Sequence, residues 1–375
     1  MPFRVTLGAM LTAAAANDAS DVHLTAGLPP LIRVEGLLQQ LGDSSSIITN
    51  EWITTHLIAE MRDDARKHFE QHGEVDLSYG QAGIGRVRIN VFRQKGQLAA
   101  ALRLVPNEIK SIDQLGMPQI AQELALRPRG LVLVTGPTGS GKSTTLAAMV
   151  DAINDEVPAH VITIEDPIEF EHTSRTALIH QREIGSDTAS FHEALRRSLR
   201  QDPDVILIGE LRDTVSMEAA MLAAETGHLV LATLHTQGAA KSINRLVGAF
   251  PDGRHDQIRR QLGDTLLGIV SQTLLPRAQG RGRVVATEVM VNTPGVANLI
   301  REGDVAQLYS AMEAGAAHGM HTLDQDLRRL LQSGEISLTD AKNTGVHTMN
   351  FDSIHVRTEN VDMEAWGSDE STARW

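Results

Sequence analysis

The sequence of 375 residues contains no cysteine. A chain without thiols forms no disulfide, gives no cysteine ligand to zinc and has no thiol nucleophile, and this composition suits a reducing compartment such as the cytoplasm. The sequence also lacks any apolar run close to the roughly 20 residues that a membrane-spanning helix requires. We therefore expect a protein that folds without disulfides and does not insert into a membrane.

Basic residues are in deficit, because 34 lysines and arginines stand against 47 aspartates and glutamates, for a formal net charge of -13. A protein that follows a nucleic-acid duplex usually carries a basic domain or stripe. Here the basic residues form only short clusters, such as Arg196, Arg197 and Arg200. The charge balance therefore argues against a nucleic-acid partner.

The N-terminus loosely imitates a secretory signal peptide, because Met1 to Arg4 precede an apolar run from Val5 to Ala16. A signal peptide is usually more basic ahead of its apolar run. We favour an amphipathic first helix over about 4–17, with the signal peptide as the alternative.

A glycine-rich loop lies between a hydrophobic strand at 131–135 and a helix-forming run from Thr145 to Ile153. Its sequence fits G-x-x-x-x-G-K-[ST], the phosphate-binding P-loop, in the strand–loop–helix context that the motif requires. Glycines let successive backbone N–H groups point inward at a polyphosphate, and the helix adds the positive end of its dipole. The predicted nucleotide-binding residues of the loop are Gly136, Pro137, Thr138, Gly139, Ser140, Gly141, Lys142, Ser143 and Thr144.

Two side chains of the loop have distinct predicted roles. Lys142 can reach the β- and γ-phosphates, and the Ser143 hydroxyl can hold Mg²⁺. Binding of phosphate does not by itself imply hydrolysis, which also needs groups that position water and hold the metal ion.

The distribution of apolar residues divides the chain into four predicted parts: 1–106, 107–118, 119–345 and 346–375. The first holds short strands and helices, including a helical run at 51–71. The second is a linker with proline turns at each end. The third alternates strands and helices, which is typical of an α/β fold with a mainly parallel sheet, and then becomes helical. The fourth is an acidic tail, predicted to be disordered, that holds Trp366 and Trp375.

Strand-like runs of the third part lie at 131–135, 161–165, 177–180, 205–209, 229–233 and 284–291. The stretch 254–275 carries an apolar stripe at helical spacing, including Ile258, Leu262 and Ile269, and predicts a helix that packs on the sheet.

One strand of the first part has a basic face. In the run 86–93, Arg86, Arg88 and Asn90 alternate with Val87, Ile89 and Val91. A half-buried strand with solvated arginines would explain this pattern. A basic face directed at an acidic ligand or a neighbouring subunit would explain it equally.

Three clusters follow strands of the third part, where the ligands of an α/β sheet bind. An acidic loop over 164–169 ends at Glu169. Four aliphatic residues at 205–208 lead to Gly209 and Glu210, a variant of the Walker B pattern, in which an aspartate usually ends the strand. His235 follows the strand at 229–233, and His228 precedes it. A single histidine is more often structural, yet one at the end of this strand could sense a γ-phosphate.

Together these motifs resemble the type IV pilus retraction ATPase (PilT) family of secretion-type ATPases, over about residues 4–340. The resemblance also rests on the runs at 19–24, 27–30, 199–204, 209–213, 224–228, 233–236 and 271–276. It implies a RecA-like P-loop core with a PAS-like α+β N-terminal domain and a C-terminal helical segment, assembled as a homohexameric ring. In such rings ATP binds between the two domains.

The resemblance also implies the roles of individual residues. Glu169 would be the catalytic carboxylate, and Glu210 the Walker B carboxylate near Mg²⁺. His228 and His235 would sense the nucleotide. The arginines that reach nucleotide across an interface would correspond to Arg88 and Arg103, which assigns a function to the basic strand face.

The same resemblance implies a cytoplasmic motor at the inner face of the inner membrane, peripheral to it, which drives pilin disassembly against a platform protein. Pilus-assembly and secretion ATPases are the closest alternatives. They usually have a longer N-terminal region and a tetracysteine zinc site, which this chain lacks. The retraction motif A-I-R-N-L-I-R-E corresponds to residues 295–302, with Ala297 in place of its first arginine. A RecA-like nucleic-acid motor and a ring without turnover are more distant alternatives.

Overall fold

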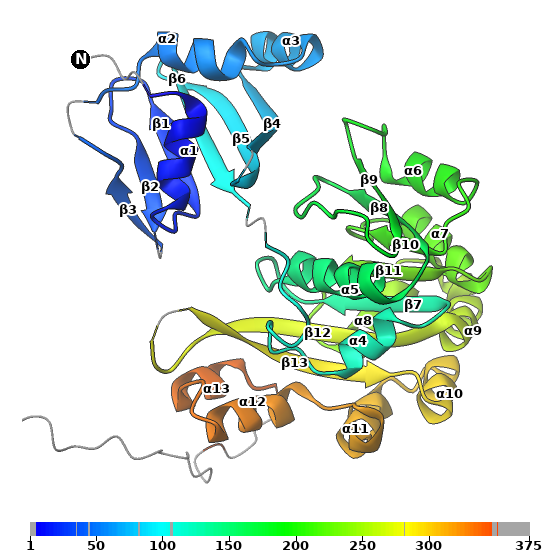
Figure 1. Cartoon of the computed structure of the whole chain (residues 1–375). Coiled ribbons are helices and arrows are strands. Elements are labelled where there is room, and N and C mark those ends of the chain that lie inside the picture. The colour runs from blue at the N-terminus through cyan, green and yellow to red at the C-terminus, as the bar shows by residue number, and fades with distance from the viewer. Residues whose placement is uncertain are drawn as a thin grey trace, which may run out of the picture. The chain divides into compact units, whose positions relative to one another are not determined.

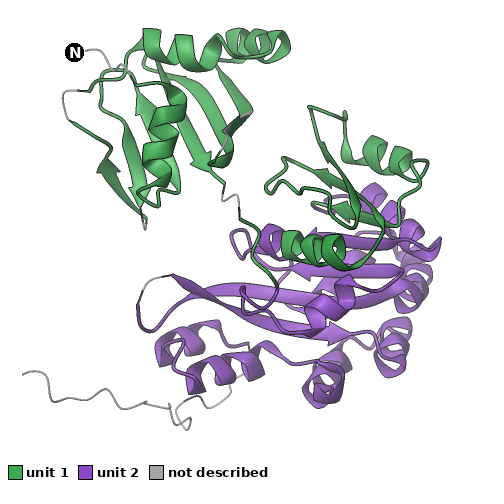
Figure 2. Cartoon of the chain, viewed as in Figure 1, with its two compact units in different colours: residues 1–111, 146–209 green, residues 112–145, 210–375 purple. Residues whose placement is uncertain are grey.

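The computed structural model describes residues 5–34, 36–43, 46–81, 83–105, 108–280, 282–346 and 351. The chain divides into two compact units (Figure 2), which are described one at a time. Unit 1 comprises residues 1–111 and 146–209, and unit 2 comprises residues 112–145 and 210–375. The domain boundaries expected from the sequence stay predictions. Apart from residue 346 and Phe351, the acidic tail lies outside the described residues.

Unit 1 contains an antiparallel sheet with the strand order β3-β2-β1-β6-β5-β4 (Figure 1). Its strands are β1 (Asp21–Thr25), β2 (Leu31–Val34), β3 (Leu37–Gln40), β4 (Glu74–Gln81), β5 (Gly85–Gln94) and β6 (Gln97–Leu104). On β5 the side chains of Val87, Ile89 and Val91 are buried. The alternation predicted for this strand is therefore confirmed, and its basic residues occupy the opposite face.

The helices beside this sheet are α1 (Leu7–Ala15), α2 (Asn50–Ile53) and α3 (Asp63–His72), with a π-helical turn, η1 (Thr54–Ile58). Helix α1 buries Met10, Leu11 and Ala14 in the core of the sheet, as expected for an amphipathic helix. The prediction of a single helix over 51–71 is wrong in one respect, because the structure divides this run into two helical stretches. Arg62 has an extended backbone (ψ 155°), which separates the first helical stretch from α3.

Unit 1 also holds the parallel strands β8 (His160–Glu165), β9 (Leu178–Glu183) and β10 (Val205–Ile208), in the order β10-β8-β9, and helix α6 (Phe191–Ser198). Helix α5 (Lys142–Glu156) begins in unit 2 and continues into unit 1. All four residues of β10 are buried, as a strand of aliphatic residues in a parallel sheet should be.

In unit 2 the strands lie in the order β13-β12-β7-β11. They are β7 (Gly130–Thr135), β11 (Leu229–Leu234), β12 (Leu266–Pro276) and β13 (Arg283–Val291). Strand β7 is parallel to both β11 and β12, and only β13 is antiparallel to its neighbour. The register pairs Thr135 with Leu234, so β7 and β11 end side by side. With the strands of unit 1, this arrangement confirms the expected α/β class.

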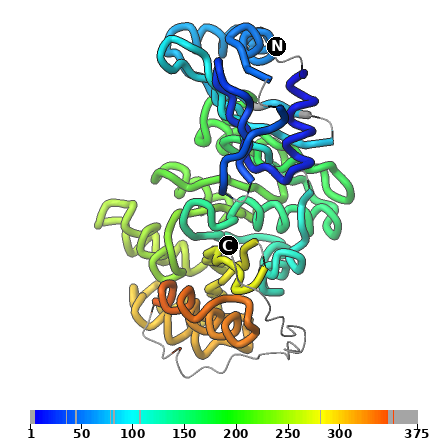
Figure 3. The backbone as a smooth tube through the Cα atoms, turned by 90° about the vertical axis from the view of Figure 1, so that its left-hand side faces the viewer, coloured from blue at the N-terminus to red at the C-terminus, as the bar shows by residue number. Residues whose placement is uncertain are grey.

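The helices of unit 2 are α4 (Ile120–Ala125), α7 (Thr214–Glu225), α8 (Ala239–Val247), α9 (His255–Thr265), α10 (Pro294–Glu302), α11 (Ala306–Ala314), α12 (Leu323–Gln332) and α13 (Leu338–Thr344), with short 3₁₀ turns η2 (Asp252–Arg254) and η3 (Ala316–His318). The last helices, α11 to α13, gather along one side of the β12–β13 pair in both views (Figures 1 and 3). They form the helical C-terminal segment that the sequence predicts.

The helix expected over 254–275 is wrong in its second half. Helix α9 ends at Thr265, and β12 begins at Leu266. The run from Leu266 to Val270 is short and apolar, and periodicity alone does not distinguish a buried strand from a buried helix in such a run. Gly268 allows the strand to pack closely, because a β-carbon there would lie 2.8 Å from the carbonyl oxygen of Met290.

His172, in the loop between β8 and β9, offers a test of the packing of unit 1. Burial lowers the pKa of its ring to about 4, below the value of 6.5 that an exposed histidine has. The unfolded chain therefore binds a proton at a higher pH than the folded chain does, so stability is lost as the pH falls below 6.5.

The variant His172→Gln should remove this dependence. Between pH 7.5 and pH 6 the native chain should lose about 1 kcal/mol of unfolding free energy more than the variant. Denaturant titrations at both pH values measure the difference, with the exposed His192→Gln as the control. The same pH dependence in His172→Gln and the native chain would refute this account.

Candidate active site

The glycine-rich loop connects the end of β7 to the first turn of α5, and two of its glycines are required by geometry. Gly136 has φ 143°, and a β-carbon there would lie 2.2 Å from the carbonyl oxygen of Gln272. Gly141 has φ 89° and lies against the side chain of the same glutamine. Only glycine takes both backbones without strain. The loop therefore has the strand–loop–helix context predicted for it.

Lys142 lies over this loop with its side chain largely buried. Its Nζ donates hydrogen bonds to the carbonyl oxygens of Gly136, at 2.9 Å, and Pro137, at 3.0 Å. Lys142 is also the first residue of α5, so its backbone lies at the end of the helix where the dipole is positive. Ser143, next in the chain, is exposed. This end of the helix is suited to a polyphosphate anion.

A chain of polar contacts joins the loop to the residues that follow β10 and β11. Thr138 Oγ1 lies 3.3 Å from His235 Nδ1, and His235 Nε2 lies 3.2 Å from Glu210 Oε1. Arg212 Nε donates to the second oxygen of Glu210 at 2.8 Å. Three residues predicted from separate motifs, Thr138, Glu210 and His235, are thus brought together within unit 2.

The backbone explains why Glu210 reaches this place. The N–H of Leu211 donates to the carbonyl oxygen of Thr233 at 3.0 Å, which ties the segment after Gly209 to the last residues of β11. Glu210 and His235 therefore emerge at the carboxyl ends of the strands, the edge where α/β proteins bind ligands.

His228 lies at the other end of β11. Its ring Nδ1 is 3.0 Å from the carbonyl oxygen of Ala223, and its own carbonyl accepts from the N–H of Gly130 at 3.0 Å. Since β7 and β11 each rise by about 3.3 Å per residue, the length of a strand separates His228 from the loop of its own unit. The role in nucleotide sensing that the family resemblance implies for His228 stays a prediction.

Magnesium was expected at Ser143 and Glu210. No cluster of three or more His, Cys, Asp or Glu side chains suited to a metal ion occurs in the described parts of the chain. Mg²⁺ usually takes only one or two protein ligands and completes its octahedron with water and phosphate oxygens. The exposed hydroxyl of Ser143 and the carboxylate of Glu210 would supply two protein ligands, which fits this coordination.

The predicted catalytic carboxylate, Glu169, and the two predicted arginines, Arg88 and Arg103, lie in unit 1. Arg88 Nη1 is 3.3 Å from Glu169 Oε1, and both side chains are about one-third exposed. Arg103 Nε donates to Asp21 Oδ1 at 2.9 Å. The register places Arg88 directly opposite Arg103, and Arg103 opposite Asp21. The basic face of β5 thus continues across β6.

An ion pair that sequence reasoning did not identify supports the acidic loop. Arg86 Nη2 donates to Glu183 Oε2 at 2.5 Å, and Glu183 is buried. The same oxygen accepts from the N–H of Ile168, the residue before Glu169, at 3.1 Å. These contacts fix the backbone that carries Glu169. Glu183 ends β9 and belongs to no motif, and Arg182 beside it is charged as well, so nothing in the local sequence distinguishes Glu183.

Burial also changes one carboxyl of this loop. It raises the pKa of Glu165, although Thr163 and Gln181 donate hydrogen bonds to it, at 2.7 Å and 3.2 Å.

Residues from the sheet and the acidic loop line a cleft of about 1130 Å³ in unit 1, which includes Arg86, Arg88, Arg103, Asp166 and Glu183. The charges of the cleft are mixed, because arginines and carboxylates both line it.

Among the described residues, no helix is both long and apolar enough to cross a membrane.

The family model described as "Type II/IV secretion system protein" matches residues 2–355. The chain is 46% identical over 342 residues to the type IV pilus retraction ATPase PilT of Pseudomonas aeruginosa, across 91% of this chain and 98% of the relative. It is also 46% identical over 308 residues to a twitching motility protein of Neisseria gonorrhoeae, across 82% of each.

Among solved structures, the pilus retraction motor PilT with bound ADP is similar with a TM-score of 0.86 and 44% identity, over 92% of this chain and 98% of that chain. The ATPase DotB of Legionella pneumophila is similar with a TM-score of 0.76 and 28% identity, over 92% and 96% of the two chains.

Proposed function

This chain belongs to the Type II/IV secretion system protein family and, within it, to the type IV pilus retraction ATPases, and we propose that it is an ATP-hydrolysing motor that powers pilus retraction. The observation that carries the proposal is 46% identity to PilT across nearly the whole length of both chains. The contacts that join Thr138, His235 and Glu210 at the P-loop provide independent support, because they connect a phosphate-binding loop to two groups suited to hydrolysis.

Unit 2 would bind and sense the nucleotide. The backbone N–H groups of the loop and the ammonium of Lys142 hold the β- and γ-phosphates, and Ser143 and Glu210 would hold Mg²⁺, which neutralises phosphate charge when bound. His235 contacts both the loop and Glu210, so loss of the γ-phosphate at the loop would alter its position. This contact would make His235 a reporter of hydrolysis.

Unit 1 would supply the remaining chemistry. Glu169 accepts a proton from the attacking water, and Arg88 and Arg103 stabilise the charge that develops on the phosphates. In the structure Arg88 and Glu169 are paired with each other. This ion pair must open before either side chain meets its target, so turnover would require a rearrangement within unit 1.

We place this motor in a homohexameric ring at the cytoplasmic face of the inner membrane, peripheral to the bilayer and in contact with a platform protein of the pilus. The absence of a membrane-spanning helix among the described residues is compatible with this location.

The position of Ala297 is relevant to pilus retraction as the output of the motor. It is buried on α10, so a small side chain suits the packing at this departure from the retraction motif.

Secretion is the alternative output, because the family model that matches the chain is described as a type II/IV secretion system protein. Deletion of the gene distinguishes the two. Loss of twitching motility together with excess surface pili would support retraction. Loss of surface pili would indicate assembly, and normal pili with a secretion defect would indicate a secretion ATPase.

A further inference from the structure

Gln272 is the residue that connects β12 to the P-loop. It is 3% exposed, and it follows Ser271, which lies beside the last residue of β7. Its Nε2 donates to the carbonyl oxygen of Ser140 at 2.7 Å, and its Oε1 accepts from Thr145 Oγ1 at 2.9 Å. One side-chain amide therefore bonds both the loop and the first turn of α5.

The contact with Ser140 determines the orientation of a peptide group. A peptide bond is planar and trans, so its C=O and its N–H point in opposite directions. When Gln272 holds the carbonyl of Ser140 toward β12, the N–H of Gly141 must point away from β12. This orientation suits phosphate binding, because in a P-loop the backbone N–H groups bind the phosphates.

The second contact ties this peptide to the helix. Thr145 lies one turn into α5, and its N–H donates to the carbonyl oxygen of Gly141 at 3.0 Å. Its hydroxyl donates to Gln272 Oε1 at 2.9 Å and has a longer contact, 3.8 Å, with the sulfur of Met117. The side-chain amide of glutamine donates through its nitrogen and accepts through its oxygen, and both atoms lie in one rigid plane. It therefore holds Ser140 and Thr145 at a fixed separation.

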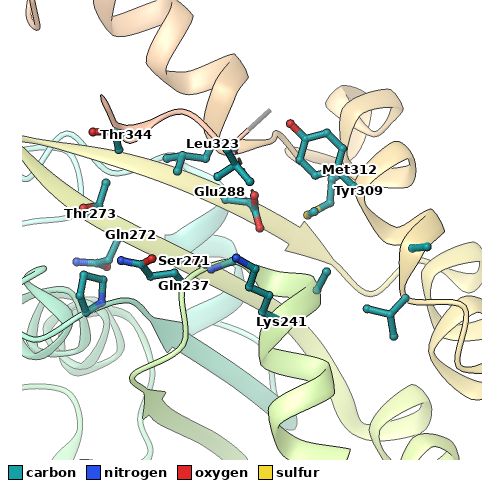
Figure 4. Close-up of a pocket in the computed structure, with 16 residues that line it drawn as sticks. Gln237, Lys241, Ser271, Gln272, Thr273, Glu288, Tyr309, Met312, Leu323 and Thr344 are labelled. Carbon is teal, nitrogen blue, oxygen red and sulfur yellow. Dashed lines mark hydrogen bonds between the residues drawn. The ribbon is translucent and has the colours of Figure 1, made fainter. Parts of the chain in front are cut away.

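Ser271, the neighbour of Gln272 on β12, and Glu288 on the adjacent strand β13 hold a different segment. Ser271 Oγ accepts from the N–H of Gly238 at 2.9 Å, and its cross-strand partner Glu288 accepts from the N–H of Ala239 at 2.7 Å. These bonds fix the start of α8, shortly after His235. Figure 4 shows Gln272 with Ser271 and Glu288 around the cavity of about 280 Å³ on this side. Strand β12 is thus a common support for the P-loop and the His235 segment.

We propose that Gln272 is a positioning residue for the nucleotide: it orients the Ser140–Gly141 peptide so that the loop binds the phosphates of ATP and ADP. The inference rests on the proposed ATPase function. Gln272 would act on the affinity of the loop for the phosphates. Its substitution should therefore mainly weaken binding and raise KM, with a smaller effect on kcat.

Two substitutions separate the contacts. Gln272→Met keeps the length of the side chain and removes both hydrogen bonds, whereas Thr145→Val removes only one. We expect Gln272→Met to weaken ADP binding and to raise KM for ATP about tenfold. Thr145→Val should have a smaller effect, and Thr145→Ser, which keeps the hydroxyl, should restore the native values. Because the two residues share a bond, the double variant should be less impaired than the sum of the single variants.

The measurements are fluorescence titration with a labelled ADP, steady-state hydrolysis and thermal melting of the full chain. Gln237→Met, an exposed glutamine that also lines the cavity, is the matched control. Native ADP affinity in a folded Gln272→Met would overturn the inference, as would a loss of kcat with unchanged affinity. If Gln272→Met does not fold, Thr145→Val decides, and native ADP affinity in that variant would overturn the inference. A native chain that neither binds nor hydrolyses ATP would instead refute the proposed function.

Discussion

Lys142→Ala is expected to reduce ATP hydrolysis to background, with turnover at least about a hundredfold below that of the native chain. The lysine is 8% exposed, and its ammonium bonds to the carbonyl oxygens of Gly136 and Pro137 over the P-loop. No other side chain of the loop carries a positive charge. Without it, the loop holds the β- and γ-phosphates only through backbone N–H groups, and the charge of the transition state is not compensated.

Phosphate release at saturating ATP measures this effect. The control is Lys67→Ala, which removes an exposed lysine from α3. Thermal melting of both variants verifies that the fold is retained. A Lys142→Ala protein that is folded and turns over normally would exclude the P-loop as the catalytic centre.

Glu210→Gln is expected to separate binding from hydrolysis. The carboxylate contacts His235 at 3.2 Å and accepts from Arg212 at 2.8 Å. Glutamine keeps the size of the side chain but not its charge, so the loop and Lys142 still hold ATP. We expect turnover to fall by about a hundredfold or more, while ATP affinity changes little. In this respect the variant should differ from Lys142→Ala, in which ATP affinity should fall together with turnover.

The matched control for this variant is Glu218→Gln. Glu218 is also a carboxylate paired with an arginine, Arg254, at 2.8 Å, but it is half exposed on α7. Turnover should be native in the control. Native turnover in Glu210→Gln would remove this residue from the catalytic site and with it the Walker B interpretation of residues 205–210.

Local patterns predicted the parts of the site that depend on spacing. The P-loop needs its glycines and Lys142 within a few residues of each other. The alternation on β5 likewise reveals its buried face, because a strand has a period of two. Such signals are contained in a short window of sequence, so the structure agrees with them.

Contacts between distant segments could not be predicted in this way. Gln272 meets Ser140 across 132 positions of the chain, and it lies in a strand that periodicity assigned to a helix. Glu183 meets Arg86 across 97 positions. Glu183 belongs to no motif, and Gln272 lies in a run (271–276) that supports the family resemblance without indicating which residues it contacts, because both contacts come from strand order and register.

The central claim is that ATP hydrolysis by this chain drives pilus retraction, and it is tested most directly by watching labelled pili on living cells. A deletion strain would be supplied with either the native chain or Glu210→Gln, and the retraction events of individual pili would be counted. We predict that pili extend in all strains and retract only with the native chain. Retraction restored equally by Glu210→Gln, or a deletion strain that extends no pili, would contradict the claim.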